Sequence, residues 1–310
     1  MDVLCIGEIL VDFLPGNEPG SYIRNAGGAP ANVAIAVARN GLKSGFIGKV
    51  GRDDFGRFLV STLTANGVEN VCTEPTADAV TTMAFVTLHE GGERTFTFVR
   101  KPGADMFLSR DDIKDDVIDR TRIVHGGSCS LSQSPAAEAT RQALRIAHEK
   151  GKIVSFDVNY RPLMWNGDQE ISARTISSVF KYVDLLKISE EEVDLVGGET
   201  NIPRLMDDAR ICLVVVTRGA SGATYHFGKS VVSVAGHQVE AIDATGAGDA
   251  FWGGFLSSLL LDGVTRADHL TEEMVLRATK YGNIAGCLSV QTKGAITSLP
   301  TREQILKYRE

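Results

Sequence analysis

Short apolar runs alternate with helical patterns along most of this chain of 310 residues. The apolar runs, which are bounded by turn residues and typical of strands buried on both faces, are residues 3–9, 153–158, 185–188 and 213–217. The segments with helical spacing between them are residues 29–40, 135–150 and 173–180. This alternation predicts an α/β fold in which helices wrap a mainly parallel sheet.

Two stretches interrupt the alternation, at about 11–28 and about 79–105. In the second stretch, two alternating segments flank Glu90-Gly-Gly-Glu93, which has the turn chemistry of a β-hairpin. Such alternation indicates strands that cover another surface rather than strands inside a parallel core. We expect the two stretches to form a small β-sheet lid, inserted in a single domain that spans residues 1–310.

The net charge of −7 and the pI near 5.5 disfavour binding to nucleic acid or to an anionic membrane, because either partner needs a basic surface. No apolar run approaches the roughly 20 residues of a membrane span, and the amino terminus lacks the basic start of a signal peptide. The five cysteines are scattered and lack C-x-x-C spacing. We therefore expect a cytoplasmic protein with a small-molecule partner.

The segment Asp243-Ala-Thr-Gly-Ala-Gly-Asp249 places three small residues and a carboxylate before an apolar helical stretch. Gly246, Ala247 and Gly248 leave backbone N–H groups uncovered, and the positive end of the following helix attracts an anion. An acidic residue at a helix start is often only a cap, but a cap does not explain why the preceding residues are all small. The segment therefore predicts a phosphate-sized turn, with Asp249 as a base in the first turn of a partly buried helix.

Near the amino end, Gly27 and Gly28 lead into a helix of small apolar residues that begins near Pro30. The glycines permit close approach of the backbone to a ligand, and Asn32 supplies an amide at the helix start. Tight helix packing explains the alanines of this helix but not the paired glycines. This segment predicts a second binding loop.

Two other phosphate-binding patterns fail on spacing. Residues 222–230 look like a P-loop, but five residues stand between the glycines where that motif has four, and a strand follows instead of a helix. A dinucleotide-binding fingerprint needs G-x-G-x-x-G after the first strand. Gly246-Ala-Gly248 comes late in the chain and has no correctly spaced third glycine.

Together, the two glycine-containing segments resemble the two signature regions of the ribokinase-like, PfkB-type carbohydrate kinases, and the chain is most similar to the fructokinases among them. The resemblance runs from Cys5-Ile-Gly-Glu-Ile-Leu-Val-Asp12 to Gly294-Ala-Ile-Thr-Ser-Leu-Pro300, with the motifs in the family's order. It implies a ribokinase-like three-layer α/β/α core with a mostly parallel central sheet and a small β-sheet lid. It also implies ATP as co-substrate, Mg²⁺, and a sugar held between the carboxyl edge of the sheet and the lid.

The resemblance makes Asp249 the general base for the sugar hydroxyl, with Gly246, Ala247 and Gly248 as the anion hole. The positions that it assigns to the sugar hydroxyls are Asp12, Gly27, Gly28 and Asn32. A carboxylate and an amide are suited to fixing several hydroxyls, although a solvated residue at the end of a strand is the alternative for Asp12.

Two arginines are further candidates for the sugar site. Arg100 is expected to reach from the lid toward the sugar. Arg161 follows a predicted strand, so we expect it at the same sheet edge, where it clamps a phosphate or a sugar hydroxyl or else forms a surface salt bridge.

On the nucleotide side, Thr217-Arg-Gly219-Ala-Ser-Gly222 follows an apolar strand and resembles the family's nucleotide-binding turn, although an ordinary hairpin loop has the same composition. The other positions assigned to the nucleotide are Asn159, Lys187 and Asn283.

Cation binding is assigned to two acidic positions. Ser189-Glu-Glu-Glu192 has the spacing of a capping box, and the resemblance gives Glu192 the task of organising Mg²⁺ through water; the two roles are compatible. The family usually has Asn where this chain has Ser189, which weakens the assignment of that position. Asp243 lies where relatives bind a monovalent cation such as K⁺.

We expect ATP-dependent phosphorylation of D-fructose at O6. The alternative within the class is 2-keto-3-deoxygluconate kinase, or another sugar or nucleoside kinase of the family, since an acidic sugar also suits Arg100 and Arg161. A sugar-sensing protein without catalysis is the alternative from another class, and it has no need of Asp249. Many relatives pair through the exposed face of the lid, so a homodimer is a further expectation.

Overall fold

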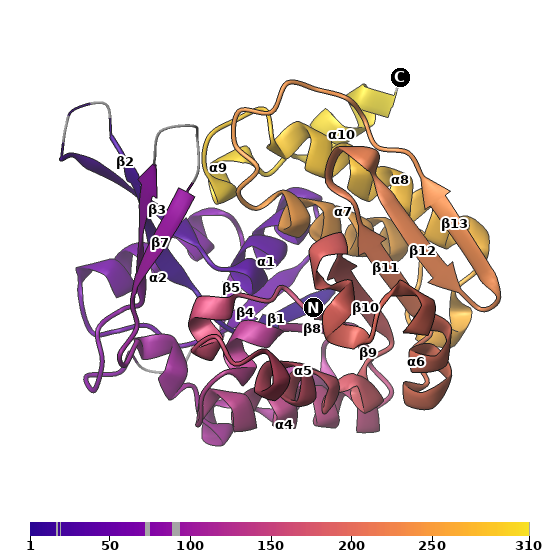
Figure 1. Ribbon diagram of the computed structural model, residues 1–310. Helices are drawn as coiled ribbons and strands as arrows, with labels where there is room; N and C mark the ends of the chain where they lie inside the picture. The colour runs from indigo at the N-terminus through magenta and orange to yellow at the C-terminus, as the bar shows by residue number, and fades with distance from the viewer. Residues whose placement is uncertain (17, 19, 72–74, 89–93, 310) are drawn as a thin grey trace.

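The computed structural model describes residues 1–309 apart from 17, 19, 72–74 and 89–93. A large central sheet carries helices on both faces, and a smaller sheet projects from one side of it (Figure 1). The predicted α/β/α core with a mostly parallel sheet and a small second sheet is confirmed.

Thirteen strands lie in the described part of the chain. They are β1 (Val3–Ile6), β2 (Leu10–Pro15), β3 (Tyr22–Gly27), β4 (Ser44–Ile47), β5 (Glu69–Asn70), β6 (Met83–Leu88), β7 (Arg94–Val99), β8 (Ile123–Gly127), β9 (Ile153–Asp157), β10 (Leu185–Ser189), β11 (Leu213–Thr217), β12 (Ala223–Phe227) and β13 (Ser230–Val234).

The α-helices lie between and after these strands. They are α1 (Ala29–Arg39), α2 (Asp54–Ala65), α3 (Asp115–Asp119), α4 (Ala136–Glu149), α5 (Gln169–Ser177), α6 (Ile202–Ala209), α7 (Ala247–Leu261), α8 (Glu272–Ser289), α9 (Ala295–Ser298) and α10 (Arg302–Arg309).

The central sheet has nine strands in the order β13-β12-β11-β10-β9-β8-β1-β4-β5. Its seven strands from β11 to β5 run parallel, whereas β12 and β13 form an antiparallel hairpin at one end. Because parallel strands point the same way, the residues that follow β1, β9, β10 and β11 meet at one edge of the sheet.

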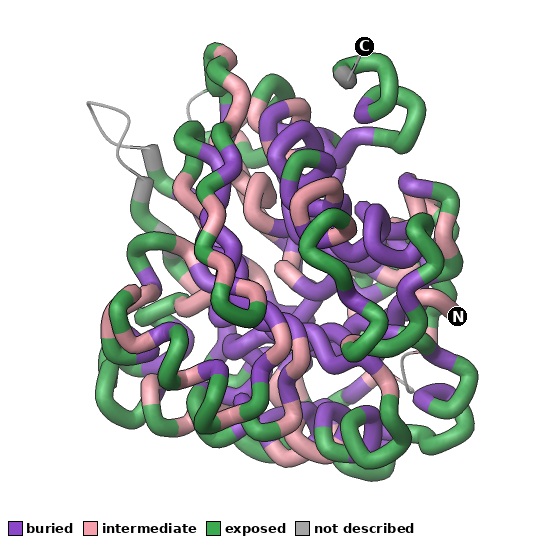
Figure 2. Tube along the Cα trace, turned by 90° about the vertical axis from the view of Figure 1, so that its right-hand side faces the viewer, coloured by how far each residue is buried: buried purple, intermediate pink, exposed green. Residues whose placement is uncertain are grey.

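The strands of the central sheet are buried on both faces, which is why they are continuous apolar runs. In β10, Leu186 and Ile188 pack in the core with α4 and α6, while Leu185 packs in the opposite core with α1, α7 and α8. Each fully buried side chain of this size contributes about 1.5–3 kcal/mol. Figure 2 shows this buried interior surrounded by exposed turns.

Helix α7 lies between α1 and α8. It is buried from Asp249 to Leu260, so the helix is more completely buried than the partly buried helix that the sequence predicted. Small residues permit this enclosure: a Cβ on Gly253 would overlap Ala36, and one on Gly254 would lie 2.8 Å from the Cβ of Ala285.

The smaller sheet has the strand order β3-β2-β6-β7. β6 and β7 form the predicted hairpin, and the predicted turn at residues 90–93 lies outside the described residues. β2 pairs with both β3 and β6, so the two stretches that interrupt the α/β alternation join in one sheet.

Two predicted elements have different bounds. The first strand ends at Ile6 and not at residue 9, because the chain turns at Gly7, whose φ of +146° suits glycine. The helix predicted over residues 173–180 is α5, which starts at Gln169 because Asp168 caps it by accepting a hydrogen bond from the Ile171 N–H. In the described part of the chain, no helix has the length and apolar character needed to cross a bilayer.

Candidate active site

Two cavities lie at the carboxyl edge of the central sheet, on either side of the turn that starts α7. The first, here called the Asp249 cavity, has a volume of about 380 Å³ and lies between this edge and the smaller sheet. The second, here called the Thr217 cavity, has a volume of about 260 Å³. Ala244 lines both cavities, so the segment from Ala244 to Asp249 separates them.

Asp249 is the third residue of α7 and lines the Asp249 cavity. Its Oδ2 accepts a hydrogen bond of 2.7 Å from Nδ2 of Asn32, on α1, and α7 has no side-chain cap hydrogen bond. The interpretation of Asp249 as a simple cap is therefore not supported. Burial raises the pKa of Asp249 to about 6, against the lowering effects of Asn32, Lys187 and Arg161. A carboxylate with this pKa is a stronger base than an exposed one and is still mostly ionised at pH 7.

Asp12, on β2, faces the same cavity. Burial raises the pKa of Asp12 to about 7; Asp243 and Asp249 add to this, while Arg161 opposes it. A Cβ at Gly27 would overlap the Asp12 carboxylate, so glycine there makes room for this side chain. Asp12 is a partly buried wall of the cavity and not a freely solvated residue at the end of a strand.

Gly28 lines the cavity just before α1. Its φ is +110°, and a Cβ there would lie 2.5 Å from the carbonyl oxygen of Glu8. Both facts favour glycine, and both bring the backbone to the cavity wall. Thus Asp12, Gly28, Asn32 and Asp249 are brought together as the sequence predicted, with Gly27 behind them.

Glu8 also lines this cavity, and we did not predict it as a site residue. Its Oε1 accepts a hydrogen bond from the Ala29 N–H at 3.2 Å, whereas Oε2 is buried and has no partner among the described residues. Burial raises the pKa of Glu8 to about 7. The signal was present in the sequence as an acidic residue inside the apolar run 3–9, two residues after the strand actually ends at Ile6.

The Thr217 cavity is lined by four of the six residues assigned to the nucleotide, Thr217, Gly219, Gly222 and Asn283, together with Ala247 and Gly248 of the predicted anion hole. The turn after β11 is a hairpin loop that leads into β12, and it also lines this cavity. Its assignment to the nucleotide stays a prediction. Nδ2 of Asn283 donates to the carbonyl oxygens of Val234 and Ala235, which fixes this side chain against the segment after β13.

The turn between the cavities has the conformation that its small residues allow. Gly246 has a φ of +78° and starts α7, so the amides of Ala247, Gly248 and Asp249 begin the helix. A Cβ on Gly248 would lie 3.3 Å from Nζ of Lys187, which places this ammonium beside the turn. First-turn amides together with an ammonium form a site suited to an anion.

Three more predicted residues lie around the junction. Asn159 and Arg161 line the Asp249 cavity and not the Thr217 cavity, so Asn159 lies on the side predicted for the sugar and not on the side predicted for the nucleotide. Arg161 is exposed, and its Nη1 donates to the carbonyl oxygen of Tyr160 at 3.1 Å, in contrast to the surface salt bridge that we considered for it. Glu192 accepts hydrogen bonds from the N–H groups of Ser189, at 2.9 Å, and Tyr160, at 2.5 Å. The first of these bonds is the predicted capping arrangement.

Arg100 has a different setting from the one predicted. It directly follows β7 but does not line the Asp249 cavity. Its guanidinium forms a buried ion pair with Asp105, with Nη2 and Oδ2 2.8 Å apart, and donates to Oγ of Ser132 at 3.2 Å. It lines a neighbouring cavity of about 300 Å³ that shares Phe98 and Met164 with the Asp249 cavity.

Asp243 binds its own loop. Oδ1 accepts from N and Oγ1 of Thr245, and Oδ2 accepts from the N–H of Gly294, 51 residues later. These bonds fix the segment before the turn of α7. Among the described residues, no three His, Cys, Asp or Glu side chains form a cluster that could hold a metal ion directly.

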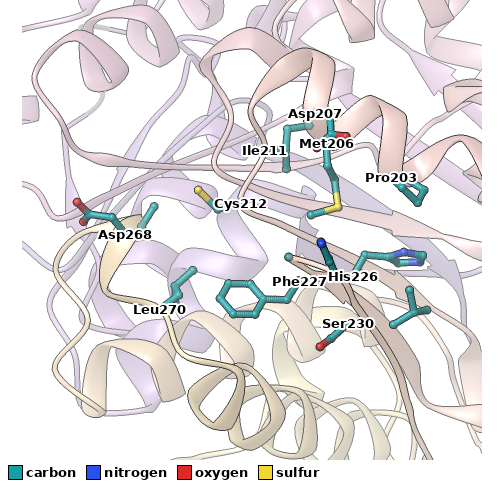
Figure 3. A pocket seen from close by; sticks show the side chains of 14 residues that line it. Pro203, Met206, Asp207, Ile211, Cys212, His226, Phe227, Ser230, Asp268 and Leu270 are labelled. Carbon is teal, nitrogen blue, oxygen red and sulfur yellow. The ribbon is translucent and has the colours of Figure 1, made fainter.

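A larger cavity, of about 650 Å³, lies at the opposite edge of the sheet (Figure 3). Met206 of α6, Phe227 at the end of β12, and Leu270 surround it in Figure 3. None of the predicted site residues lines it, so cavity volume alone does not identify the functional site here.

The comparisons with known proteins agree with this fold. A profile of the pfkB family carbohydrate kinases matches residues 1–302. The chain belongs to this family.

Its relatives include several fructokinases. Fructokinase-1 of Oryza sativa subsp. japonica is 38% identical, with 99% of this chain and 97% of the relative covered. The structure of a fructokinase with bound ATP from Xylella fastidiosa matches with a TM-score of 0.90 and 32% identity, covering 99% and 97% of the two chains. The fructokinase of Vibrio cholerae O395 in a form with fructose, ADP and calcium ion matches with a TM-score of 0.88 and 37% identity, covering 100% and 99%.

Proposed function

We propose that this protein is an ATP-dependent fructokinase that phosphorylates D-fructose at O6. The observation that carries the proposal is the junction of two cavities at the amino end of α7. Asp249 lines one cavity, Gly248 lines the other, and both residues belong to the first turn of α7, whose backbone amides point toward the amino end of the helix. The fructokinases with bound fructose, ATP or ADP are similar over nearly the whole chain, which supports this choice of substrates.

The residues divide the reaction between them. Fructose lies in the Asp249 cavity, with its hydroxyls held by Asp12, Asn32 and Arg161. Asp249 accepts the proton of the O6 hydroxyl as the bond from O6 to the γ-phosphorus forms. The bond from that phosphorus to the β,γ-bridging oxygen breaks, and ADP leaves. The first-turn amides of Gly248 and Asp249 stabilise the charge on the transferred phosphoryl group, whereas the Ala247 N–H already donates to the carbonyl oxygen of Ala244.

Mg²⁺ fits at Glu192. Each carboxylate oxygen of Glu192 accepts one N–H hydrogen bond, which leaves lone pairs for waters of a hydrated cation. When bound with the nucleotide, Mg²⁺ neutralises phosphate charge. K⁺ near Asp243 is proposed from the family resemblance alone. The Asp243 carboxylate itself accepts hydrogen bonds from Oγ1 of Thr245 and the N–H of Gly294.

The charges in the Asp249 cavity favour a neutral sugar. Glu8, Asp12 and Asp249 line it against a single guanidinium, that of Arg161. Arg100, which an acidic sugar would need, is paired with Asp105. A carboxylate substrate such as 2-keto-3-deoxygluconate would therefore meet like charge without a second cation, whereas fructose would not.

Three further parts of the proposal concern the smaller sheet and the setting of the protein. The sheet acts as a lid that closes over bound sugar and excludes water.

The exposed side chains of Tyr22 and Ile23 on this sheet, at 48% and 55% exposure, form the contact of a homodimer. The protein acts in the cytoplasm.

A sugar panel tests the proposed function. Initial rates with ATP and Mg²⁺ are measured by coupled ADP detection for fructose, glucose, ribose, 2-keto-3-deoxygluconate and a riboside. We expect the highest kcat/KM for fructose and a product phosphorylated at O6. A higher kcat/KM for the acidic sugar or the riboside would refute fructose as the substrate. Saturable fructose binding without turnover would instead indicate a sensor.

A further inference from the structure

Asp157 is a buried carboxylate at the centre of the site to which the steps above give no task. It is the last residue of β9, at the carboxyl edge of the sheet, and its exposure is 1%. In the parallel pairing of β9 with β10 it stands opposite Lys187. Its Oδ2 lies 2.8 Å from Nζ of Lys187, and both side chains are almost completely buried.

The alternation of side chains along the strands directs this pair toward α7. Phe156 and Leu186, the residues just before Asp157 and Lys187, pack in the core of α4 and α6. Asp157 and Lys187 therefore point to the opposite face, which α7 covers. On that face Ser155 accepts a hydrogen bond of 2.9 Å from Nε1 of Trp252, in α7.

This arrangement places the Lys187 ammonium beside Gly248, which lines the Thr217 cavity. Nζ lies 3.3 Å and Cε 3.6 Å from the position of a Cβ on Gly248. A lysine side chain has four rotatable bonds, so its tip stays at one place only if a partner holds it. Asp157 is the carboxylate in contact with this ammonium.

We infer that Asp157 is a positioning residue for phosphoryl transfer, which holds the Lys187 ammonium against the first turn of α7, where the transferred phosphoryl group passes. The inference rests on the proposed function, since it gives Lys187 a phosphoryl group to neutralise. A purely structural ion pair would place both carboxylate oxygens with donors. Instead, Oδ1 of Asp157 is buried without a partner among the described residues.

The surrounding charges agree with this task. Burial alone lowers the pKa of Lys187, but the carboxylates of Asp157 and Glu192 outweigh it, so the net shift is upward and the ammonium stays charged. His125, on the neighbouring strand β8, has its pKa lowered by burial to about 4 and is neutral at physiological pH. Asp157 also raises the pKa of Asp249, whereas Lys187 lowers it.

Three variants test the inference: Asp157→Asn, Lys187→Met and the double variant. Because Asp157 acts through Lys187, we expect kcat to fall about 10-fold in Asp157→Asn and about 10²–10³-fold in Lys187→Met, with the double variant no slower than Lys187→Met. The KM for fructose should stay within about 3-fold, since neither residue lines the Asp249 cavity.

The pH profile separates positioning from a merely structural role. Without the carboxylate of Asp157, burial lowers the pKa of Lys187, so kcat of Asp157→Asn should acquire an alkaline decline that the wild type lacks. Asp184→Asn is the matched control. Asp184 lies at the opposite edge, just before β10, and accepts a hydrogen bond from the Val154 N–H at 2.8 Å. Its variant should keep the wild-type kcat and profile.

Losses that multiply in the double variant, or an unchanged kcat profile in Asp157→Asn, would overturn the inference. If a single variant does not fold, the kcat of the double variant alone tests the inference, because the double variant leaves neither charge buried without its partner. A kcat within about 3-fold of the wild type would then show that the pair is only structural. Wild-type turnover on fructose in the same series tests the proposed function separately, and binding of a nonhydrolysable ATP analogue should persist in all variants.

Discussion

Replacing Asp249 with Asn tests the base directly. Asn has the shape of Asp and retains an oxygen that accepts the 2.7 Å hydrogen bond from Nδ2 of Asn32. It does not accept a proton from a sugar hydroxyl. Removal of a general base typically lowers turnover by about 10²–10⁴-fold, and we expect kcat to fall in this range. Fructose and ATP binding should change little, because Asp12, Asn32 and Arg161 remain.

The pH dependence gives this prediction its second measurement. With the pKa of Asp249 raised to about 6, the carboxylate is ionised in about 90% of molecules at pH 7 and about 10% at pH 5. Activity should therefore be lost as the pH falls through about 6, near two pH units above the range for an ordinary Asp. Asp12, with its pKa raised to about 7, shares the cavity, so the acid limb of kcat/KM belongs to the pair. The Asp12→Asn variant should leave a limb near pH 6.

The Asp249→Asn substitution should also stabilise the folded protein. The difference between about 6 and the ordinary 3.8 for Asp249 corresponds to about 3 kcal/mol at 1.36 kcal/mol per pKa unit. Because the folded-state pKa is raised, the ionised carboxylate destabilises the protein above pH 6, and this cost disappears as the pH falls toward 4. At pH 8, the free energy of unfolding of Asp249→Asn should thus exceed that of the wild type by up to about 3 kcal/mol, so the variant unfolds at a higher urea concentration. At pH 4 the two free energies of unfolding should differ little.

Initial-rate kinetics from pH 5 to pH 9 and urea unfolding at two pH values are the assays. Calorimetry with fructose shows whether the variant still binds. Near-normal turnover in Asp249→Asn would refute the assignment of the base. A variant that keeps the wild-type acid limb in its residual activity would refute the assignment of that limb to Asp249, even if turnover fell.

Three further predictions, with four substitutions between them, concern the proposed sugar site and the packing of α7. Gly28→Ala should raise the fructose KM at least about 10-fold and lower the melting temperature, because its Cβ would lie 2.5 Å from the Glu8 carbonyl oxygen at a φ of +110°. Arg161→Gln should raise the fructose KM with a smaller effect on kcat, since Arg161 lines the cavity opposite the carboxylates. Phe255→Ala should cost about 3–5 kcal/mol in urea unfolding while Leu261→Ala, at an exposed position, costs about 0.5 or less.

Much of the site was predictable because the fold collects distant segments at one sheet edge. Thr217 and Asn283 are 66 residues apart and line one cavity, since Thr217 ends the parallel strand β11 and Asn283 lies on α8, in the layer of helices on one face of the sheet. The glycines near residues 27 and 246 were readable from their composition, because few structural reasons call for consecutive small residues at a helix start.

Partners between neighbouring strands were not predictable in the same way. Asp157 ends a strand and Lys187 interrupts an apolar run, but their pairing follows from β9 and β10 being neighbours in register. Arg100 has the sequence context of a residue that reaches into a site. Its buried ion pair with Asp105 depends on how the chain turns after β7, and the prediction that it contacts the sugar is not supported by its place in the structure.

The strength of Asp249 in its proposed role as the base depends on several opposing effects. Its position in the first turn of α7 favours the ionised form, as do Asn32 and Lys187, whereas burial favours the protonated form and dominates. A neutral sugar that fills the cavity displaces water and so adds to the burial effect, and the phosphates of ATP beyond the turn add negative charge. Both changes make Asp249 a stronger base. Asp249 is therefore weakest in the open, wetter site, where a water molecule would otherwise be the acceptor, and strongest when the O6 hydroxyl and the γ-phosphate are both in place.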